Sequence, residues 1–494
     1  MKISRIRSSV AKVSLPQWLA LAVSILGLWL RVEHAWTFDG PGRGSDYRAH
    51  LSGVHWMLEH WEPFYLRGSV DYQVRFYPPL WYAVSGLILK LSGSERAIST
   101  LAVLGWILRH TVLAKLLREA APGRHWSALV ALSINALLPL SVLIDGKVNP
   151  EGLHAGVFMV AVYFLWRMER QAREPGGVAV ITATLFGLFA GIAMLLKATA
   201  ALLVITAVLV FGRRSLLMLF DRGLRATWLR LWRPALMAAT VWCAVAGFWC
   251  GTNLVKFGHP SPHVWNLGGS AQHGKLSKPI LYRRPLGWAL PFEWHQYWEF
   301  PILRSASEPR PNFWAAEIAG TWSDYYNRGF CRLQGGDVTD RVWGGTGGAL
   351  PQGPSYWSVG YRCVGVFAKL VHVGVWLTVA AVLATLWVAW LDFRGSARVG
   401  YGSLVLPLIT WLCTLSAFTF ALAYPFDSSA VLNPRYLLPQ VTPMSACLGL
   451  AVAGFEDRAR HKDIRGALSI LAICTLLVLI GIVGALLVFE RFGS

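Results

Sequence analysis

Charged residues are scarce in this chain of 494 residues, since Asp, Glu, Lys and Arg together make up only 15% of it. Soluble globular domains carry about 25%, because their surface has to be covered by polar groups. The shortage falls mainly on acidic residues, with 26 Asp and Glu against 46 Lys and Arg. The composition therefore excludes a soluble globular protein.

The sequence also lacks the alternating segments of about 10 residues that mark a membrane β-barrel. It contains continuous blocks of Leu, Ala and Val instead, and 55% of its residues are hydrophobic. Many blocks approach the roughly 20 residues that a helix needs to cross the hydrocarbon core. The predicted fold class is an all-α, polytopic membrane protein.

Cysteine is rare as well, with seven residues in the chain. Five lie in apolar runs and are interpreted as small core side chains: Cys243, Cys250, Cys413, Cys447 and Cys474. Cys331 and Cys363 lie in or beside a long polar loop, where a disulfide would be compatible with a non-cytoplasmic location. No group of residues has metal-ligand spacing, so no metal or other cofactor is implied. A divalent metal between Asp46 and Asp145 would require the fold to bring them together.

The net charge of +20 does not indicate a nucleic-acid partner, because the basic residues form no single patch. They cluster in short loops between apolar runs, as the positive-inside rule describes for cytoplasmic loops. The first run ends in Arg31, Glu33 and His34 and is longer than a signal-peptide core, so we predict an uncleaved span with a cytoplasmic N-terminus. The candidate spans are 17–35, 98–116, 126–144, 152–167, 178–195, 198–212, 236–256, 364–391, 402–424, 437–454 and 466–489.

This charge alternation is consistent only if residues 77–93 do not cross the membrane. The segment is short and opens with Pro78 and Pro79, so we expect a re-entrant or interfacial helix. The segments then assigned to the outer side are 37–75, 145–151, the hinge near 197, 257–361 and 425–436. The domain organisation that follows is a membrane core at 1–256 with its first outer loop at 37–75, an outer region at 257–361 and C-terminal helices at 362–494.

Polar side chains at the outer ends of the apolar spans are the candidate functional residues, because such groups are costly near the hydrocarbon unless they are used. Each also has a structural interpretation: Asp145 and Glu151 could cap helices, and Lys197 could extend to the interface. Their gathering on one face is the stronger signal. The candidates are Asp46, His50, Tyr77, Asp145, Glu151, Lys197, Arg435 and Tyr436.

Together these residue types suit the transfer of a sugar from a lipid phosphate. A carboxylate such as Asp46 can accept the proton of an acceptor hydroxyl as it attacks the anomeric carbon. Lys197 and Arg435 can stabilise the negative charge that grows on the leaving phosphate, and Arg offers it two parallel donors. A single displacement of this kind inverts the anomeric centre.

Several motifs resemble GT-C glycosyltransferases. They are the early Asp46, Tyr77-Pro78-Pro79-Leu80, Gly187-Leu188-Phe189-Ala190-Gly191 before Lys197-Ala198-Thr199, Trp322-Ser323-Asp324-Tyr325-Tyr326, and Pro434-Arg435-Tyr436-Leu437-Leu438-Pro439. The nearest branch contains protein O-mannosyltransferases, the aminoarabinose transferase of lipid A and bacterial transferases that act on surface polysaccharides. Tyr47 and Arg48 stand where many relatives have a second acidic residue, and Tyr77 stands where protein mannosyltransferases have His. These departures count against a protein O-mannosyltransferase.

The resemblance implies a GT-C-type helical core of about 11 to 13 transmembrane helices with an amphipathic first outer loop, in the inner membrane of a bacterium. It also implies a polyprenyl-phosphate-linked sugar donor and a glycan, lipid or protein acceptor. From the matching motif positions, the resemblance implies that Asp46 is the catalytic base and that Lys197 and Arg435 hold the carrier phosphate. It implies further that Asp145 or Glu151 completes the site. Tyr436, Tyr77 and His50 are further candidate binding residues.

Two other functions stay open at the level of sequence. A lipid-linked oligosaccharide ligase or polymerase would use a diphosphate-linked donor and a His base, for which His50, His55, His259, His263 and His273 are available. A transporter or flippase would show paired repeats and charges near the middle of the membrane. The sequence discloses neither the sugar nor the acceptor.

Overall fold

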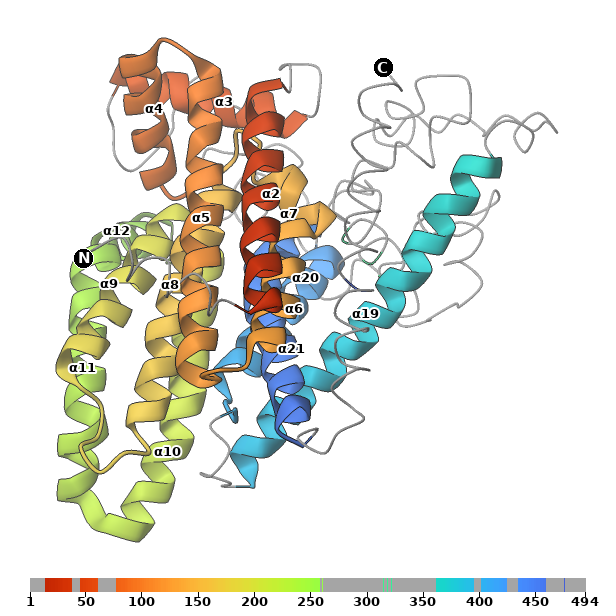
Figure 1. Ribbon diagram of the computed structural model, residues 1–494. Helices are drawn as coiled ribbons and strands as arrows, with labels where there is room; N and C mark the ends of the chain where they lie inside the picture. Colours follow the sequence, from red (N-terminus) through yellow and green to blue (C-terminus); the bar gives the residue numbers. More distant parts are fainter. Residues whose placement is uncertain are drawn as a thin grey trace, which may run out of the picture.

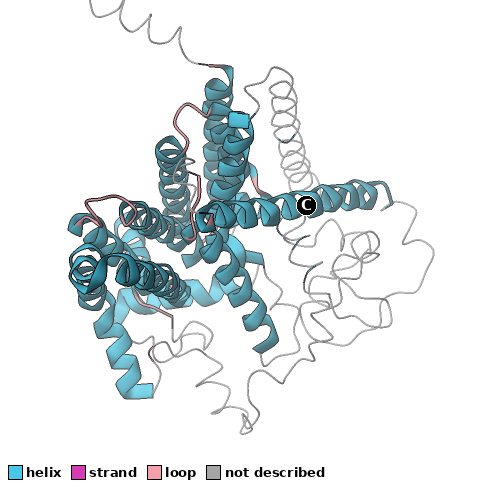
Figure 2. Ribbon diagram, turned by 90° about the horizontal axis from the view of Figure 1, so that it is seen from below, coloured by secondary structure: helices cyan, strands magenta, loops and turns pink. Residues whose placement is uncertain are grey.

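The computed structural model describes residues 14–37, 45–60, 77–257, 361–394, 401–423 and 434–458, with residues 260, 314, 318, 321 and 475 as single positions. Within this part of the chain the regular structure is helical, and Figure 2 shows no strand in it. The predicted all-α class is confirmed for these residues.

The helices follow one another with short connections over most of the N-terminal half. They are α2 (Leu15–Thr37), α3 (Ser45–His60), α4 (Leu80–Ser92), α5 (Glu95–Ala120), α6 (His125–Leu137), α7 (Pro139–Ile144), α8 (Pro150–Gln171), α9 (Val180–Leu196), η1 (Ala198–Ala200), α10 (Ala201–Thr227), η2 (Trp228–Trp232), α11 (Arg233–Trp242), η3 (Cys243–Gly247), α12 (Phe248–Phe257), α19 (Tyr361–Phe393), α20 (Val405–Ala423), η8 (Pro434–Leu437) and α21 (Leu438–Arg458).

Six of the described helical segments are long and apolar enough to cross a membrane: Leu15–Trp36, Glu95–Ala120, Ala198–Phe220, Gly223–Val255, Val373–Phe393 and Leu438–Asp457. Large apolar side chains also stay exposed along α2, among them Trp18, Ile25 and Trp29, as a lipid-facing helix requires. The chain is therefore a multi-pass integral membrane protein. The span predicted at 466–489 lies outside the described residues except for Thr475, so the predicted helix count stays a prediction.

Successive long helices run in opposite directions (Figure 1). In that view α2 rises, α5 descends, α6 with α7 rises and α8 descends, and α19 descends before α20 rises. The α7–α8 and α9–α10 connections therefore lie at the upper ends of their helices, whereas the α5–α6 and α8–α9 connections lie at the lower ends. This arrangement agrees with the alternation predicted from the loop charges.

Helix α4 is too short to cross the membrane. Its 13 residues extend over about 20 Å, against about 30 Å for the hydrocarbon core. It ends at Gly93, which has a left-handed backbone conformation (φ 66°) and whose N–H donates to the carbonyl of Leu89. Helix α5 begins directly afterwards. α4 packs on α3 and α5 at the upper end of α5 (Figure 1), in agreement with the prediction for residues 77–93.

Glycines at a spacing of four residues let pairs of helices approach closely. A Cβ on Gly156 of α8 would lie 2.4 Å from the carbonyl oxygen of Gly105 on α5, and one on Gly105 would lie 2.2 Å from that of Gly152. Likewise a Cβ on Gly187 of α9 would lie 2.3 Å from the oxygen of Ala238 on α11. Small residues of this kind allow backbone contact between membrane helices. The Gly187–Gly191 motif therefore has a packing role.

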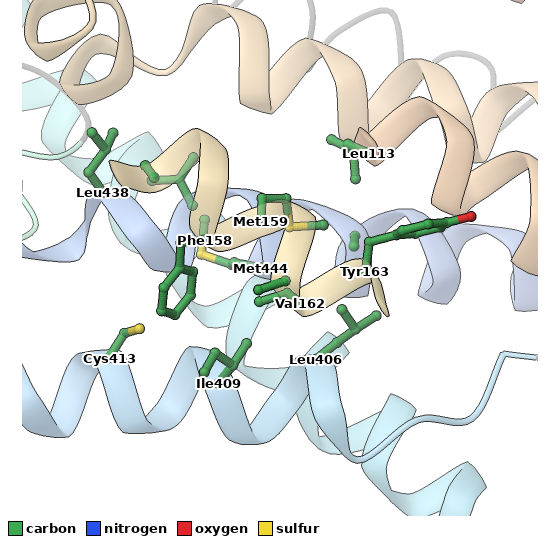
Figure 3. Close-up of a cluster of buried hydrophobic side chains, with 14 of the residues drawn as sticks. Leu113, Phe158, Met159, Val162, Tyr163, Leu406, Ile409, Cys413, Leu438 and Met444 are labelled. Carbon is green, nitrogen blue, oxygen red and sulfur yellow. The ribbon is translucent and has the colours of Figure 1, made fainter. Parts of the chain in front are cut away.

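The hydrophobic core surrounds α8. Figure 3 shows side chains of α8 between those of α5, α20 and α21. Cys413 and Cys447 are buried, as the core interpretation predicted, but Cys243 is exposed. That interpretation was wrong for Cys243, because η3, the π-helical segment that contains it, leaves this side chain outside the packed interior. Cys331 and Cys474 lie outside the described residues, so whether Cys331 and Cys363 form a disulfide stays open.

Candidate functional site

A break between α9 and α10 positions Lys197. The residue is the C-cap of α9 and has an extended backbone (φ −159°, ψ 136°), after which the chain makes the single turn η1. The apolar run 178–212 is thus interrupted at its one lysine. The break turns Lys197 out of the helical path, and its side chain is buried with 7% of its surface exposed.

Glu151 neutralises Lys197. The Nζ atom of Lys197 lies 2.9 Å from Oε1 of Glu151, which is 2% exposed. Glu151 stands in the first turn of α8, where the helix dipole favours a carboxylate. The cap of this helix is Asn149, whose Oδ1 accepts from the backbone N–H of Glu151 at 3.0 Å. Glu151 therefore acts as a partner for Lys197 and not as the cap.

Tyr436 closes this site from a distant part of the chain. The ammonium of Lys197 lies 5.1 Å from the centroid of the Tyr436 ring, within the range of a cation–π interaction. Tyr436 belongs to η8, so the backbone of Arg435 is one residue away. The side chain of Arg435 lies outside the described part of the structure. Three predicted residues, Glu151, Lys197 and Tyr436, are thus brought together.

His154 joins the same cluster and was not among the predicted residues. It follows Glu151 by almost one turn of α8, is fully buried, and its Nε2 lies 3.4 Å from Oγ1 of Thr199. Its ring also contacts Phe158, with 5.5 Å between the centroids. The spacing of Glu151 and His154 on one helix and of Lys197 and Thr199 in one motif could have indicated this second contact.

Asp145 has a different environment from Glu151. Its Oδ2 accepts from Nε of Arg31 at 2.8 Å, from Nη2 of Arg109 at 2.6 Å and from Oγ of Ser141 at 2.9 Å. The side chains of Arg31, Arg109 and Asp145 are all fully buried. The sequence interpretation missed both arginines, although each stands in or at the end of an apolar run. Asp145 is the C-cap residue of α7, as the capping interpretation allowed, and its backbone N–H donates to the carbonyl of Ser141 at 3.0 Å. Its carboxylate belongs to the buried ion-pair cluster, and its role toward substrate stays a prediction.

His50 fixes the outer helix α3 on α4. Its Nδ1 lies 2.9 Å from the hydroxyl oxygen of Tyr82, and its ring contacts Tyr77 and Trp81 with centroids 5.6 Å away in each case. It is 3% exposed. His50 and Tyr77, each predicted as a candidate binding residue, are thus in ring contact. These contacts are those of a docked helix, and a role of either residue toward substrate stays a prediction.

Asp46 lies on α3 one turn before His50, but its side chain is outside the described part. The neighbouring Tyr47 donates to Oε2 of Glu95 at 3.1 Å. Burial and the adjacent Glu95 carboxylate raise the pKa of Tyr47 to about 12. α4 contacts both α3 and α9, so the helix that carries Asp46 is connected to α9 through α4. Among the described residues, no group of three His, Cys, Asp or Glu is placed to hold a metal ion.

No protein-family model and no curated protein sequence matches the chain. Solved structures similar to it are ArnT from Cupriavidus metallidurans, in the apo state and bound to undecaprenyl phosphate, and arabinosyltransferase EmbB from Mycobacterium smegmatis. Each of the two ArnT structures is 15% identical in sequence to this chain. The TM-score is 0.35 for the apo state and 0.38 for the complex with undecaprenyl phosphate. The alignments cover 89% and 88% of this chain and 76% and 77% of the ArnT chain. For EmbB the identity is 15%, the TM-score 0.34, and the coverage 96% of this chain and 41% of EmbB. TM-scores this low do not establish a common fold.

Proposed function

We propose that this protein is a membrane glycosyltransferase that moves a sugar from a polyprenyl-phosphate carrier to an acceptor at the non-cytoplasmic face of a bacterial inner membrane. The observation that carries the proposal is the ammonium of Lys197, held in a helix break between Glu151 and Tyr436. A lysine buried among membrane helices is rare unless it has a function. Its place at a helix end suits the head-group level of a lipid carrier.

Lys197 and Arg435 are the proposed partners of the carrier phosphate. An ammonium group has three donors, so Lys197 can keep its hydrogen bond to Glu151 and still donate to a phosphate oxygen. The Tyr436 ring, 5.1 Å away, also stabilises the cation. Arg435, next to Tyr436 in η8, would add the two parallel donors that a guanidinium offers to phosphate.

Asp46 is the proposed general base. In the proposed step an acceptor hydroxyl attacks the anomeric carbon, its proton passes to the Asp46 carboxylate, and the bond from that carbon to the phosphate oxygen breaks. The electron pair leaves with the carrier phosphate, whose charge Lys197 and Arg435 stabilise. The displacement is single, inverts the anomeric centre and needs no cofactor.

The contacts of His50 favour this reaction over a ligase with His50 as its base. His50 is 3% exposed and hydrogen-bonds Tyr82, which suits a residue that docks α3. In the proposed enzyme its role is to hold the helix that carries Asp46, and through it the position of the base.

The direct assay uses purified protein in nanodiscs with synthetic polyprenyl-phosphate sugars and measures released polyprenyl phosphate. Asp46→Asn should lower release by about 10²- to 10⁴-fold, the usual contribution of a general base. Glu59→Gln is the matched control, because Glu59 is an exposed carboxylate on the same helix, and it should leave release unchanged. Wild-type turnover by Asp46→Asn would refute the assignment of the base.

A further inference from the structure

The turn between α7 and α8 is anchored at both ends. Asp145 at its start binds the arginine pair, and Glu151 at its end binds Lys197. Within the turn, Lys147 N–H donates to the carbonyl of Ile144 at 3.2 Å, and Asn149 N–H donates to the carbonyl of Lys147 at 3.1 Å. The backbone of the turn is therefore internally bonded, so the position of one anchor constrains the other.

Asn149 connects the two anchors through its side chain. Its Oδ1 accepts from the N–H groups of Glu151 at 3.0 Å and Gly152 at 3.4 Å, and its Nδ2 reaches the carbonyl of Ile144 at 3.5 Å. One amide thus bonds the last residue of α7 and the first turn of α8. A displacement of Asp145 would therefore also displace Glu151, because Asn149 connects the two ends of this short turn.

Ser141 is the centre of the arginine cluster. Its Oγ accepts from Nη2 of Arg109 at 2.6 Å and from Nη2 of Arg31, and donates to Oδ2 of Asp145 at 2.9 Å. Arg31 also donates through Nη1 to the carbonyls of Gly27 and Ala136, at 2.8 and 2.7 Å. The cluster therefore ties α2, α5 and α6 to the start of the turn.

We propose that Arg31, Arg109, Ser141 and Asp145 form a positioning cluster for the phosphate site. The cluster fixes the turn 145–151 so that Glu151 holds Lys197 where the carrier phosphate binds. This inference rests on the proposed function. The four side chains act through the turn and need no contact with substrate, because they are fully buried.

Stability alone does not account for this cluster. Buried ion pairs can often be replaced by apolar residues without loss of stability, and two arginines with one carboxylate leave one positive charge in excess within the cluster. What the charges supply is a geometry set by several short hydrogen bonds in a low-dielectric interior. That geometry is useful where a turn has to be held in one position.

The test is a double-mutant cycle on the affinity for polyprenyl phosphate. Ser141→Ala removes the central hydroxyl but keeps all three charges, and it should weaken binding about three- to tenfold. In a Glu151→Gln background the same substitution should have little further effect, because both act on Lys197. Ser127→Ala is the control: Ser127 is equally buried but bonds Gly449 on α21, and its loss should leave affinity unchanged.

Additive losses in the double variant, or unchanged affinity in Ser141→Ala, would overturn the proposal. Hydrogen exchange of the amides of residues 145–152 supplies a readout independent of the lipid. Ser141→Ala should speed exchange there about tenfold while Ser127→Ala does not, and equal exchange in both variants would also overturn it. If wild-type protein binds no polyprenyl phosphate, the proposed function fails, and the exchange comparison still decides whether the cluster fixes the turn.

Discussion

Lys197 and Glu151 show how one ion pair can serve both folding and chemistry. Both side chains are buried and 2.9 Å apart, so removal of either leaves a charge without its partner, which costs about 3 to 5 kcal/mol. A single substitution at Lys197 therefore mixes a loss of stability with a loss of function. The two effects separate only when both residues are changed.

The variant Lys197→Met with Glu151→Gln should fold but not transfer sugar. Lys197→Met alone leaves the Glu151 carboxylate buried without its cation, and the second substitution removes that charge. The double variant should therefore have a higher free energy of unfolding than Lys197→Met alone, close to that of the wild type. Release of polyprenyl phosphate should stay at least about 10²-fold below wild type, because a donor to the developing charge is gone. Thermal unfolding measures the stability, and the release assay measures the transfer. Release at the wild-type rate by the double variant would exclude Lys197 from the site.

Asp145→Asn should destabilise the protein strongly. The substitution removes the carboxylate that Arg31 and Arg109 share in a fully buried cluster, so we expect a loss of about 3 to 5 kcal/mol in the free energy of unfolding. Glu174→Gln, at an exposed position in the α8–α9 connection, should change it by less than about 0.5 kcal/mol. Denaturant unfolding in detergent measures both, and equal stability of the two variants would contradict the cluster.

At the scale of elements, the position of α8 decides the geometry of the site. α8 carries Glu151 and His154, and it touches α5 through Gly105, Gly152 and Gly156. Because the backbones are in contact, the two helices have no room to shift without losing this packing. The carboxylate of Glu151 is therefore placed as much by glycines as by its own hydrogen bonds.

Gly156→Ala and Gly212→Ala should have opposite effects on stability. The new Cβ at position 156 would meet Gly105 at 2.4 Å, whereas at position 212 on α10 it would meet nothing within 4 Å. Overpacking should cost about 1 to 3 kcal/mol at position 156, and the better helix propensity of Ala should add about 0.5 to 1 kcal/mol at position 212. Thermal unfolding of both variants tests this, and stabilisation by both would show that α5 and α8 are not in contact.

At the scale of the whole molecule, the two ends of the bundle carry different charge arrangements. The Lys197–Glu151 pair lies where α8 and α10 begin. Arg213 and Arg214, about midway along α10, bond Asp392 near the end of α19 at 3.0 and 2.7 Å. The proposed orientation assigns this arginine-rich end to the cytoplasm, as the positive-inside rule predicts.

Labelling with a membrane-impermeant thiol reagent tests that orientation. In a background without native cysteines, Tyr325→Cys should react from the non-cytoplasmic side of intact cells. Arg225→Cys, near the end of α10, should react only after the membrane is opened. Reaction of the cysteine at 225 in intact cells would reverse the orientation and place the Lys197 site on the cytoplasmic side.

The sequence was sufficient for the class and the helix directions, because apolar length and loop charge are local properties. It also marked Lys197, since a lysine inside an apolar run stands out. It could not show that Glu151 and Tyr436 meet this lysine, because helical spacing does not say which helices are neighbours. For the same reason Arg109, in the middle of an apolar run, was not recognised as a partner of Asp145.

The most direct measurement is a cryo-EM structure of the protein in nanodiscs with polyprenyl phosphate. The proposed function predicts phosphate density within hydrogen-bonding distance of Nζ of Lys197, about 2.7 to 3.2 Å, with the Arg435 side chain on the same phosphate and Asp46 facing the position of the sugar. Phosphate density at another place, with Lys197 bound only to Glu151 and Tyr436, would contradict it.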